Sequence, residues 1–135
     1  MSISLAPYLN FPQGATKEAM TFYQSVFGGT VEVATFGDFG VPHMPAESVM
    51  HGALTSDGFS VYGYDAAPDE YVGDHTRIRI AIVGDDVAGL SECFNALTTG
   101  GEVVAPLEKQ QWGATYGEVI DQYGVSWLFN IGGGA

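Results

Sequence analysis

Two short stretches decide the fold, VFGGTVEV at residues 26–33 and LTTGGEVV at residues 97–104. Each places two glycines between the end of a helical pattern and the start of a strand pattern, where glycine favours the end of a helix. A second pair of stretches, DGFSVYGY at 57–64 and YGVSWLFN at 123–130, shares a turn glycine followed by apolar, serine and large apolar residues. The recurrence of both pairs in the same order predicts an internal repeat.

Each half is predicted to fold as strand, helix and three further strands. The predicted strands are 3–11, 30–37, 49–55 and 59–65 in the first half, and 76–83, 102–108, 115–120 and 125–131 in the second. The predicted helices are 15–27 and 86–99, the latter with Asp85 or Asp86 as its N-cap. One such module cannot bury both faces of its sheet, so pairing is expected. The predicted class is α+β: two βαβββ modules, about 1–66 and 75–135, joined by a linker at 66–75 into a curved, mostly antiparallel sheet within one domain, 1–135.

Composition excludes several classes of function. The chain has 135 residues, 46% of them hydrophobic, which is typical of a folded globular domain. A net charge of −12 argues against nucleic acid and anionic membranes as partners. No apolar run approaches the roughly 20 residues that span a bilayer, and the N-terminus has no signal-peptide pattern. The single cysteine, Cys93, is expected in the core, and a cytoplasmic location follows as an expectation.

Three stretches carry a family resemblance: PYLNFPQGATKEAMTFYQSVFGG (7–29), VMHGALTSDG (49–58) and WGATYGEVIDQYGVSWLFNI (112–131). Together they resemble the PhnB-like branch of the vicinal oxygen chelate superfamily, which includes glyoxalase I, bleomycin-resistance proteins and extradiol dioxygenases. The resemblance implies the glyoxalase/bleomycin-resistance fold, a cleft on the concave side of the sheet and a homodimer. Members of the branch sometimes carry the label of a ubiquinone-pathway methyltransferase. The sequence does not support that label, because it has no glycine-rich cofactor turn after a strand.

The resemblance also implies where a metal would bind. Metal-dependent members use four strand residues, which correspond here to Ala6, Tyr62, Arg77 and Leu128. A glyoxalase-type site needs histidine and carboxylate ligands, and none of these four is a good ligand. We therefore expect no metal at that site and predict no cofactor.

Two of the four Lys and Arg residues occur in RIRIAIV, residues 77–83. Alternation places Ile78 and the following isoleucines on the helix-packed face, and Arg77 and Arg79 on the cleft face. In one interpretation these arginines pair with an acid, for which the candidates are Glu118, Asp65 and Glu108, or point to solvent. In the other they bind an anionic or carbonyl-bearing ligand. The side chains expected to complete that binding site are Tyr8, Asn10, Tyr62 and Tyr64.

Three more residues are candidates for the site. His51 is expected to face the cleft, where it could act as a general base or serve as a hydrogen-bonded structural residue. Glu118 is a possible acid or base, with surface exposure as the alternative. Trp112 could form a rim over the cleft or pack between chains.

These residues leave two main classes of function open, beside a third possibility in which the cleft is residual and the protein acts through its dimer surface. The first is a protein that binds a small molecule in the cleft without the glyoxalase-type metal. The second is an enzyme, either a metal-dependent lyase, isomerase or dioxygenase of the same superfamily, or one that uses His51 as base. A cleft lined by tyrosines is sufficient for small-molecule binding and needs no catalytic group.

Overall fold

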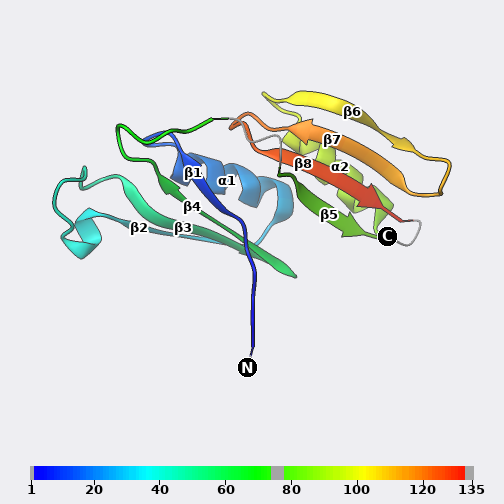
Figure 1. Ribbon diagram of the computed structural model, residues 1–135. Coiled ribbons are helices and arrows are strands. Elements are labelled where there is room, and N and C mark those ends of the chain that lie inside the picture. Colours follow the sequence, from blue (N-terminus) through cyan, green and yellow to red (C-terminus); the bar gives the residue numbers. More distant parts are fainter. Residues whose placement is uncertain (1, 74–77, 133–135) are drawn as a thin grey trace. The chain divides into compact units, whose positions relative to one another are not determined.

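The computed structural model of the chain describes residues 2–73 and 78–132, which form two compact units, Met1–Val72 and Gly73–Ala135 (Figure 1). The first unit contains β1 (Tyr8–Phe11), α1 (Thr16–Phe27), β2 (Thr30–Thr35), the 3-10 helix η1 (Gly37–Phe39), β3 (Val49–Ser56) and β4 (Phe59–Asp65). The second contains β5 (Ile80–Gly84), α2 (Val87–Leu97), β6 (Glu102–Lys109), β7 (Thr115–Ile120) and β8 (Ser126–Ile131). The repeated strand–helix–three-strand order and the α+β class are therefore confirmed.

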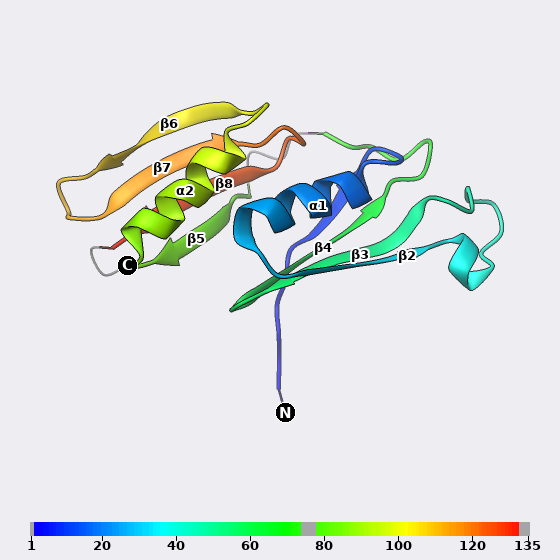
Figure 2. The ribbon, with the colours of Figure 1, turned by 180° about the vertical axis from the view of Figure 1, so that it is seen from behind.

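Each unit forms one four-stranded mixed sheet. The strand order is β1-β4-β3-β2 in the first and β5-β8-β7-β6 in the second. The first and last strands of each half pair in parallel, and the other neighbours pair antiparallel. Figure 2 shows α1 lying along one face of the first sheet and α2 along one face of the second. The opposite face of each sheet is left for side chains that do not pack on a helix.

The helices begin and end where short polar and glycine signals occur. The Asp86 carboxylate accepts a hydrogen bond from the Gly89 N–H at 3.0 Å, so Asp86 rather than Asp85 is the N-cap of α2. Gly28, with φ of 75°, ends α1 in a conformation that favours glycine. Neither helix among the described residues is long and apolar enough to cross a membrane.

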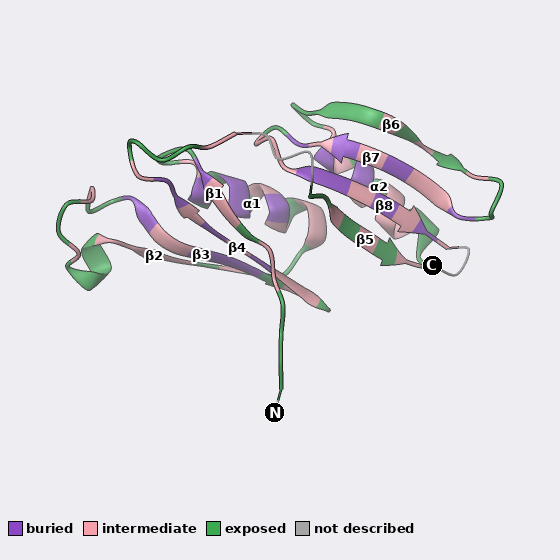
Figure 3. Cartoon of the chain, viewed as in Figure 1, coloured by how far each residue is buried: buried purple, intermediate pink, exposed green. Residues whose placement is uncertain are grey.

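In each unit the buried residues lie on the helix and on the strands of the sheet (Figure 3), and most of them are apolar and form its core. Two buried carboxylates lie beside these cores and satisfy backbone donors. Asp65 accepts hydrogen bonds from the N–H groups of Thr16 and Val49, at 3.0 and 2.9 Å. Asp121 accepts from Trp127 Nε1 at 2.8 Å, as well as from two backbone N–H groups. Asp65 was one candidate partner of the arginines. Both of its oxygens accept hydrogen bonds within the first unit, at the start of α1 and the start of β3, and its pairing with an arginine stays a prediction.

In each unit a phenylalanine side chain fills the space between the helix and the sheet. In the first unit it comes from the first strand, and in the second unit from the last strand. In the first, Phe11 lies over Gly63, where an added Cβ would approach its ring to 2.7 Å. In the second unit the two residue types exchange places. Gly84 of β5 corresponds to Phe11, and Phe129 of β8 corresponds to Gly63. The Phe129 ring packs edge-on against Phe94 of α2, with centroids 5.4 Å apart.

The first strand of each half is shorter than the sequence pattern predicts. β1 begins at Tyr8 instead of residue 3, and β5 begins at Ile80 instead of residue 76. The parallel partner sets this limit, because β8 begins at Ser126 and Ile80 already pairs with Trp127. Ile78 therefore has no strand partner and is 75% exposed, so its predicted packing on the helix face is wrong.

Candidate functional site

Four ring-bearing side chains gather on the face of the first sheet opposite α1. Gly52 of β3 and Gly63 of β4 point at α1, since a Cβ on either would meet the Met20 side chain of that helix. Strand alternation then places His51, Tyr62 and Tyr64 on the other face. Tyr8 joins them from β1, where it pairs with Tyr62 in parallel register. We call Tyr8, His51, Tyr62 and Tyr64 the tyrosine face.

The four rings of the tyrosine face form one cluster of neighbouring aromatic side chains. The Tyr8 ring centroid lies 5.8 Å from that of His51, 6.2 Å from Tyr62 and 5.5 Å from Tyr64. His51 and Tyr62 are 5.2 Å apart. All four pairs are tilted or edge-on, the arrangements that aromatic quadrupoles favour. Tyr8 is 54% exposed, so the set offers ring surface to a ligand instead of burying it.

A hydrogen bond couples the histidine of this face to a phenol. The Tyr8 hydroxyl oxygen lies 3.3 Å from His51 Nδ1. This contact holds the imidazole in one orientation and leaves Nε2 as its second polar atom. His51 was expected to face the cleft, and it lies on the same sheet face as Tyr8 and Tyr62.

Glu70 completes the edge of the tyrosine face. Its carboxylate accepts hydrogen bonds from the Tyr64 hydroxyl, from Asn10 Nδ2 at 3.3 Å and from the Ala67 N–H at 3.1 Å. Asn10 also donates to the Tyr71 carbonyl oxygen at 2.9 Å. These contacts bind the segment after β4 to the first sheet, although the sequence pattern assigned residues 66–75 to a linker. Glu70 was therefore not predicted as a site residue. The turn Ala67–Glu70 is the feature that could have indicated an ordered segment there.

The hydrogen bond between Tyr64 and Glu70 shifts both pKa values. The carboxylate partner raises the pKa of the Tyr64 hydroxyl above its ordinary value, and partial burial acts in the same direction. The same hydrogen bond lowers the pKa of the Glu70 carboxyl, with the Ala67 N–H adding to the effect. At neutral pH the edge of the tyrosine face therefore carries one negative charge.

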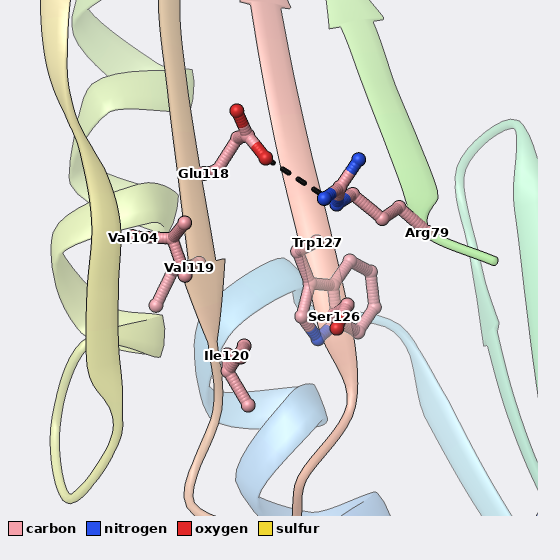
Figure 4. A pocket seen from close by; sticks show the side chains of 7 residues that line it. All are labelled: Arg79, Val104, Glu118, Val119, Ile120, Ser126 and Trp127. Atoms are coloured by element: carbon pink, nitrogen blue, oxygen red, sulfur yellow. Dashed lines mark ion pairs between the residues drawn. The ribbon is translucent and has the colours of Figure 1, made fainter. Parts of the chain in front are cut away.

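The second unit contains a small cavity beside an ion pair (Figure 4). Arg79 Nε lies 3.3 Å from Glu118 Oε1, so Glu118 is the acid that pairs with this arginine. The cavity has a volume of about 90 Å³. Its lining is Arg79, Val104, Glu118, Val119, Ile120, Ser126 and Trp127. Most of this lining is apolar, and the guanidinium is partly neutralised by its partner.

The remaining predicted site residues lie in different places. Trp112 is 62% exposed, and its ring centroid is 6.2 Å from that of Tyr116. Burial raises the pKa of the Tyr116 hydroxyl, and the nearby Glu118 charge adds to the shift. Both residues belong to the second unit, as do Arg79 and Glu118. Arg77 lies outside the described residues, so its predicted place on the cleft face stays a prediction.

The side chains at the metal positions implied by the resemblance do not fit a glyoxalase-type metal. Ala6 and Leu128 carry no ligand atom, and the Tyr62 phenol is a poor ligand when protonated. Within residues 2–73 and 78–132, no three His, Cys, Asp or Glu side chains group closely enough to hold a metal ion. We therefore derive no chemical step through a metal.

Comparison with known proteins places the chain in a family. Residues 4–129 match the model of the family described as 3-demethylubiquinone-9 3-methyltransferase. The chain belongs to this family. This PhnB-like chain is 33% identical to protein PA1353 from Pseudomonas aeruginosa, whose crystal structure superposes with a TM-score of 0.81 over 96% of this chain and 98% of that one.

Two more distant structures share the fold. One is a putative 3-demethylubiquinone-9 3-methyltransferase, PhnB protein, from Bacillus cereus, 22% identical over 96% of this chain and all of that chain, with a TM-score of 0.76. The other is a glyoxalase/bleomycin resistance protein/dioxygenase family enzyme from Burkholderia phytofirmans, 13% identical over 92% of this chain and 95% of that one, with a TM-score of 0.60. The PhnB-like branch of the vicinal oxygen chelate superfamily, expected from the sequence, is thus confirmed.

Proposed function

We propose that this PhnB-like protein binds a small organic molecule with a flat ring on its tyrosine face, without a glyoxalase-type metal. One observation carries the proposal: the other three rings lie 5.5 to 6.2 Å from the ring of Tyr8 on a partly exposed sheet face, with Tyr8 54% exposed. Rings held at these spacings present a rigid apolar surface at little entropic cost. The phenol hydroxyls supply hydrogen-bonding groups that orient a ligand.

The fold itself does not require these aromatic side chains. In the second unit, the strand positions that correspond to Tyr8, Tyr62 and Tyr64 are Ala81, Leu128 and Asn130. The same strand–helix–three-strand unit therefore forms without tyrosine at any of them. Exposed tyrosines that the architecture can do without are more readily explained by binding than by packing.

The activity named in the family's description is not part of this proposal. A methyl donor needs a dedicated binding surface, such as a glycine-rich turn between a strand and a helix of a parallel sheet. In each described sheet only the first and the last strand of that half pair in parallel. The turn after β1 reads PQGAT (12–16) and contains a single glycine. The metal positions Ala6, Tyr62 and Leu128 likewise supply no ligand set.

Catalysis through His51 is the second candidate function. The observation in its favour is the 3.3 Å contact between His51 Nδ1 and the Tyr8 hydroxyl, because such a pair can take up or pass on a proton. Replacing His51 with alanine should then abolish turnover of any substrate found, and unchanged turnover would remove His51 from that role.

A second part of the proposal concerns the domain, the oligomeric state and the cellular location of the protein. We propose one domain over residues 1–135 that works as a cytoplasmic homodimer. Each described sheet has two edge strands, β1 and β2 in the first and β5 and β6 in the second, and such edges favour pairing with another chain. Light scattering that gives a monomer at micromolar concentration would overturn the dimer.

The binding proposal is tested by a titration with three probes that share one benzene ring. Benzyl alcohol is neutral, benzyltrimethylammonium is cationic and benzoate is anionic. We expect at least one probe to shift the amide NMR signals around Tyr8, Tyr62 and Tyr64. Tyr62→Leu should abolish these shifts, whereas Leu128→Ala, at the corresponding position of the second unit, should leave them unchanged. No shift with any of the three probes would overturn the proposal.

The absence of a metal is tested separately. Elemental analysis of protein purified without chelators, with calorimetric titration of Zn²⁺, Ni²⁺, Mn²⁺ and Fe²⁺, should show no stoichiometric binding. One tightly bound metal per chain would overturn this part of the proposal and favour a metalloenzyme.

A further inference from the structure

Negative charge dominates the unit that carries the tyrosine face. Residues 1–72 contain eight Asp and Glu residues but a single basic residue, Lys17. Lys17 belongs to α1, which covers the opposite face of the sheet. This unit therefore places no lysine or arginine on the tyrosine face to receive an anionic ligand.

The charge nearest the rings is a carboxylate. Glu70 accepts the hydroxyl hydrogen of Tyr64, and Asn10 Nδ2 holds the same carboxylate oxygen at 3.3 Å. Its lowered pKa keeps Glu70 ionised at neutral pH. A phenol that donates to a carboxylate also gains electron density on its oxygen and ring, which strengthens the negative electrostatic potential of the ring face.

We infer that the tyrosine face selects an organic cation, a small molecule that carries an amine or quaternary ammonium group close to an apolar or flat body. This inference rests on the proposed binding function and names its ligand class. The Tyr8 ring, with Tyr62 at 6.2 Å and Tyr64 at 5.5 Å, supplies the π surface, and Glu70 supplies the counter-charge at its edge.

The alternative, an anionic ligand held by arginine, has less support within the described residues. Arg79 is paired with Glu118 at 3.3 Å in the second unit. An anion on the tyrosine face would meet the Glu70 charge with no compensating cation from residues 1–72, and like charges at short range disfavour binding.

The test compares benzyltrimethylammonium, benzyl alcohol and benzoate by NMR titration of the full chain at low ionic strength. We expect the cation to bind about three- to thirtyfold more tightly than the neutral alcohol, which is the range that cation–π and carboxylate contacts give at partly exposed sites. Benzoate should bind most weakly. Added salt should weaken binding of the cation and leave binding of the alcohol unchanged.

Two matched pairs of variants locate the effect. Glu70→Gln should remove most of the preference for the cation, whereas Asp69→Asn changes the net charge equally, at the adjacent exposed residue, and should preserve it. Tyr62→Phe keeps the ring and should retain binding of the cation, whereas Tyr62→Leu should lose it. The NMR spectrum of each variant reports whether the fold is intact.

The outcomes separate this inference from the proposed function. If the alcohol or benzoate binds as tightly as the cation, or if Glu70→Gln and Asp69→Asn preserve the preference equally, the ligand class is refuted while the binding function stands. If none of the three probes binds, the proposed function fails and the inference fails with it.

Discussion

The Asp65 carboxylate is expected to be one of the most sensitive positions for stability in the first unit. It is 1% exposed and accepts hydrogen bonds from two backbone N–H groups, Thr16 at the start of α1 and Val49 at the start of β3. Replacing Asp65 with alanine leaves both buried donors without a partner. At about 1–3 kcal/mol for each unsatisfied donor, the free energy of unfolding should fall by about 2–6 kcal/mol.

The conservative variant sets the scale of this effect. Asp65→Asn retains one carbonyl oxygen, so one donor stays satisfied and the loss should be about 1–3 kcal/mol. The variant also removes a negative charge at the N-terminus of α1, which adds a smaller loss. Asp69→Ala, at an exposed position, is the control and should change stability by less than about 0.5 kcal/mol.

Urea unfolding followed by far-ultraviolet circular dichroism measures the change in stability. Amide hydrogen exchange at Thr16 and Val49 adds a local readout, because both N–H groups should exchange faster in Asp65→Ala. If Asp65→Ala stays within 0.5 kcal/mol of the parent protein, or if exchange at both amides is unchanged, the role assigned to this carboxylate is refuted.

Three further predictions concern other positions. Asp121→Ala leaves the buried Trp127 Nε1 and two part-buried backbone N–H groups without their acceptor. At about 1–3 kcal/mol for the buried donor and less for each part-buried one, stability should fall by about 2–5 kcal/mol, and unchanged urea unfolding would contradict the assignment. Gly29→Ala, at φ of 98° and with its new Cβ in steric conflict with the Thr55 carbonyl oxygen of β3, should lower stability by at least about 2 kcal/mol, as measured by thermal unfolding. The Tyr64 hydroxyl should titrate above its ordinary pKa in the folded protein. The stabilisation that follows from this raised pKa is present at neutral pH and is lost as the pH rises through the raised pKa. In Glu70→Gln the pKa of Tyr64, measured by absorbance at 295 nm, should return toward its ordinary value, and no change would refute the coupling.

Repetition made the fold predictable from the sequence. The glycine pairs at 28–29 and 100–101 mark the ends of both helices, and alternation places Tyr62 and Tyr64 on the face opposite the helix. Such local patterns need no knowledge of distant contacts. They are therefore reliable for the type of each element and for the face that each strand residue takes.

Properties set by distant residues were predicted less well. The start of β5 depends on where β8 begins, which alternation in RIRIAIV does not reveal. The hydrogen bonds of Glu70 join a turn to β1 and β4, and the surrounding sequence reads as a polar linker. The hydrogen bonds that Asp65 accepts from Thr16 and Val49 were not predicted either, because a sequence pattern does not show which backbone donors fold back onto a carboxylate.

The reversed placement of phenylalanine in the two cores has a consequence for how such a chain can evolve. Recombination that copied β8 into the place of β4 would set Phe129 against Phe11, and the reverse exchange would set Gly63 beside Gly84. The first hybrid would be overpacked, whereas the second would contain a void. Exchange of single strands between the two halves is therefore expected to destabilise the chain. The tyrosines of the first half can then change without a matching change in the core of the second.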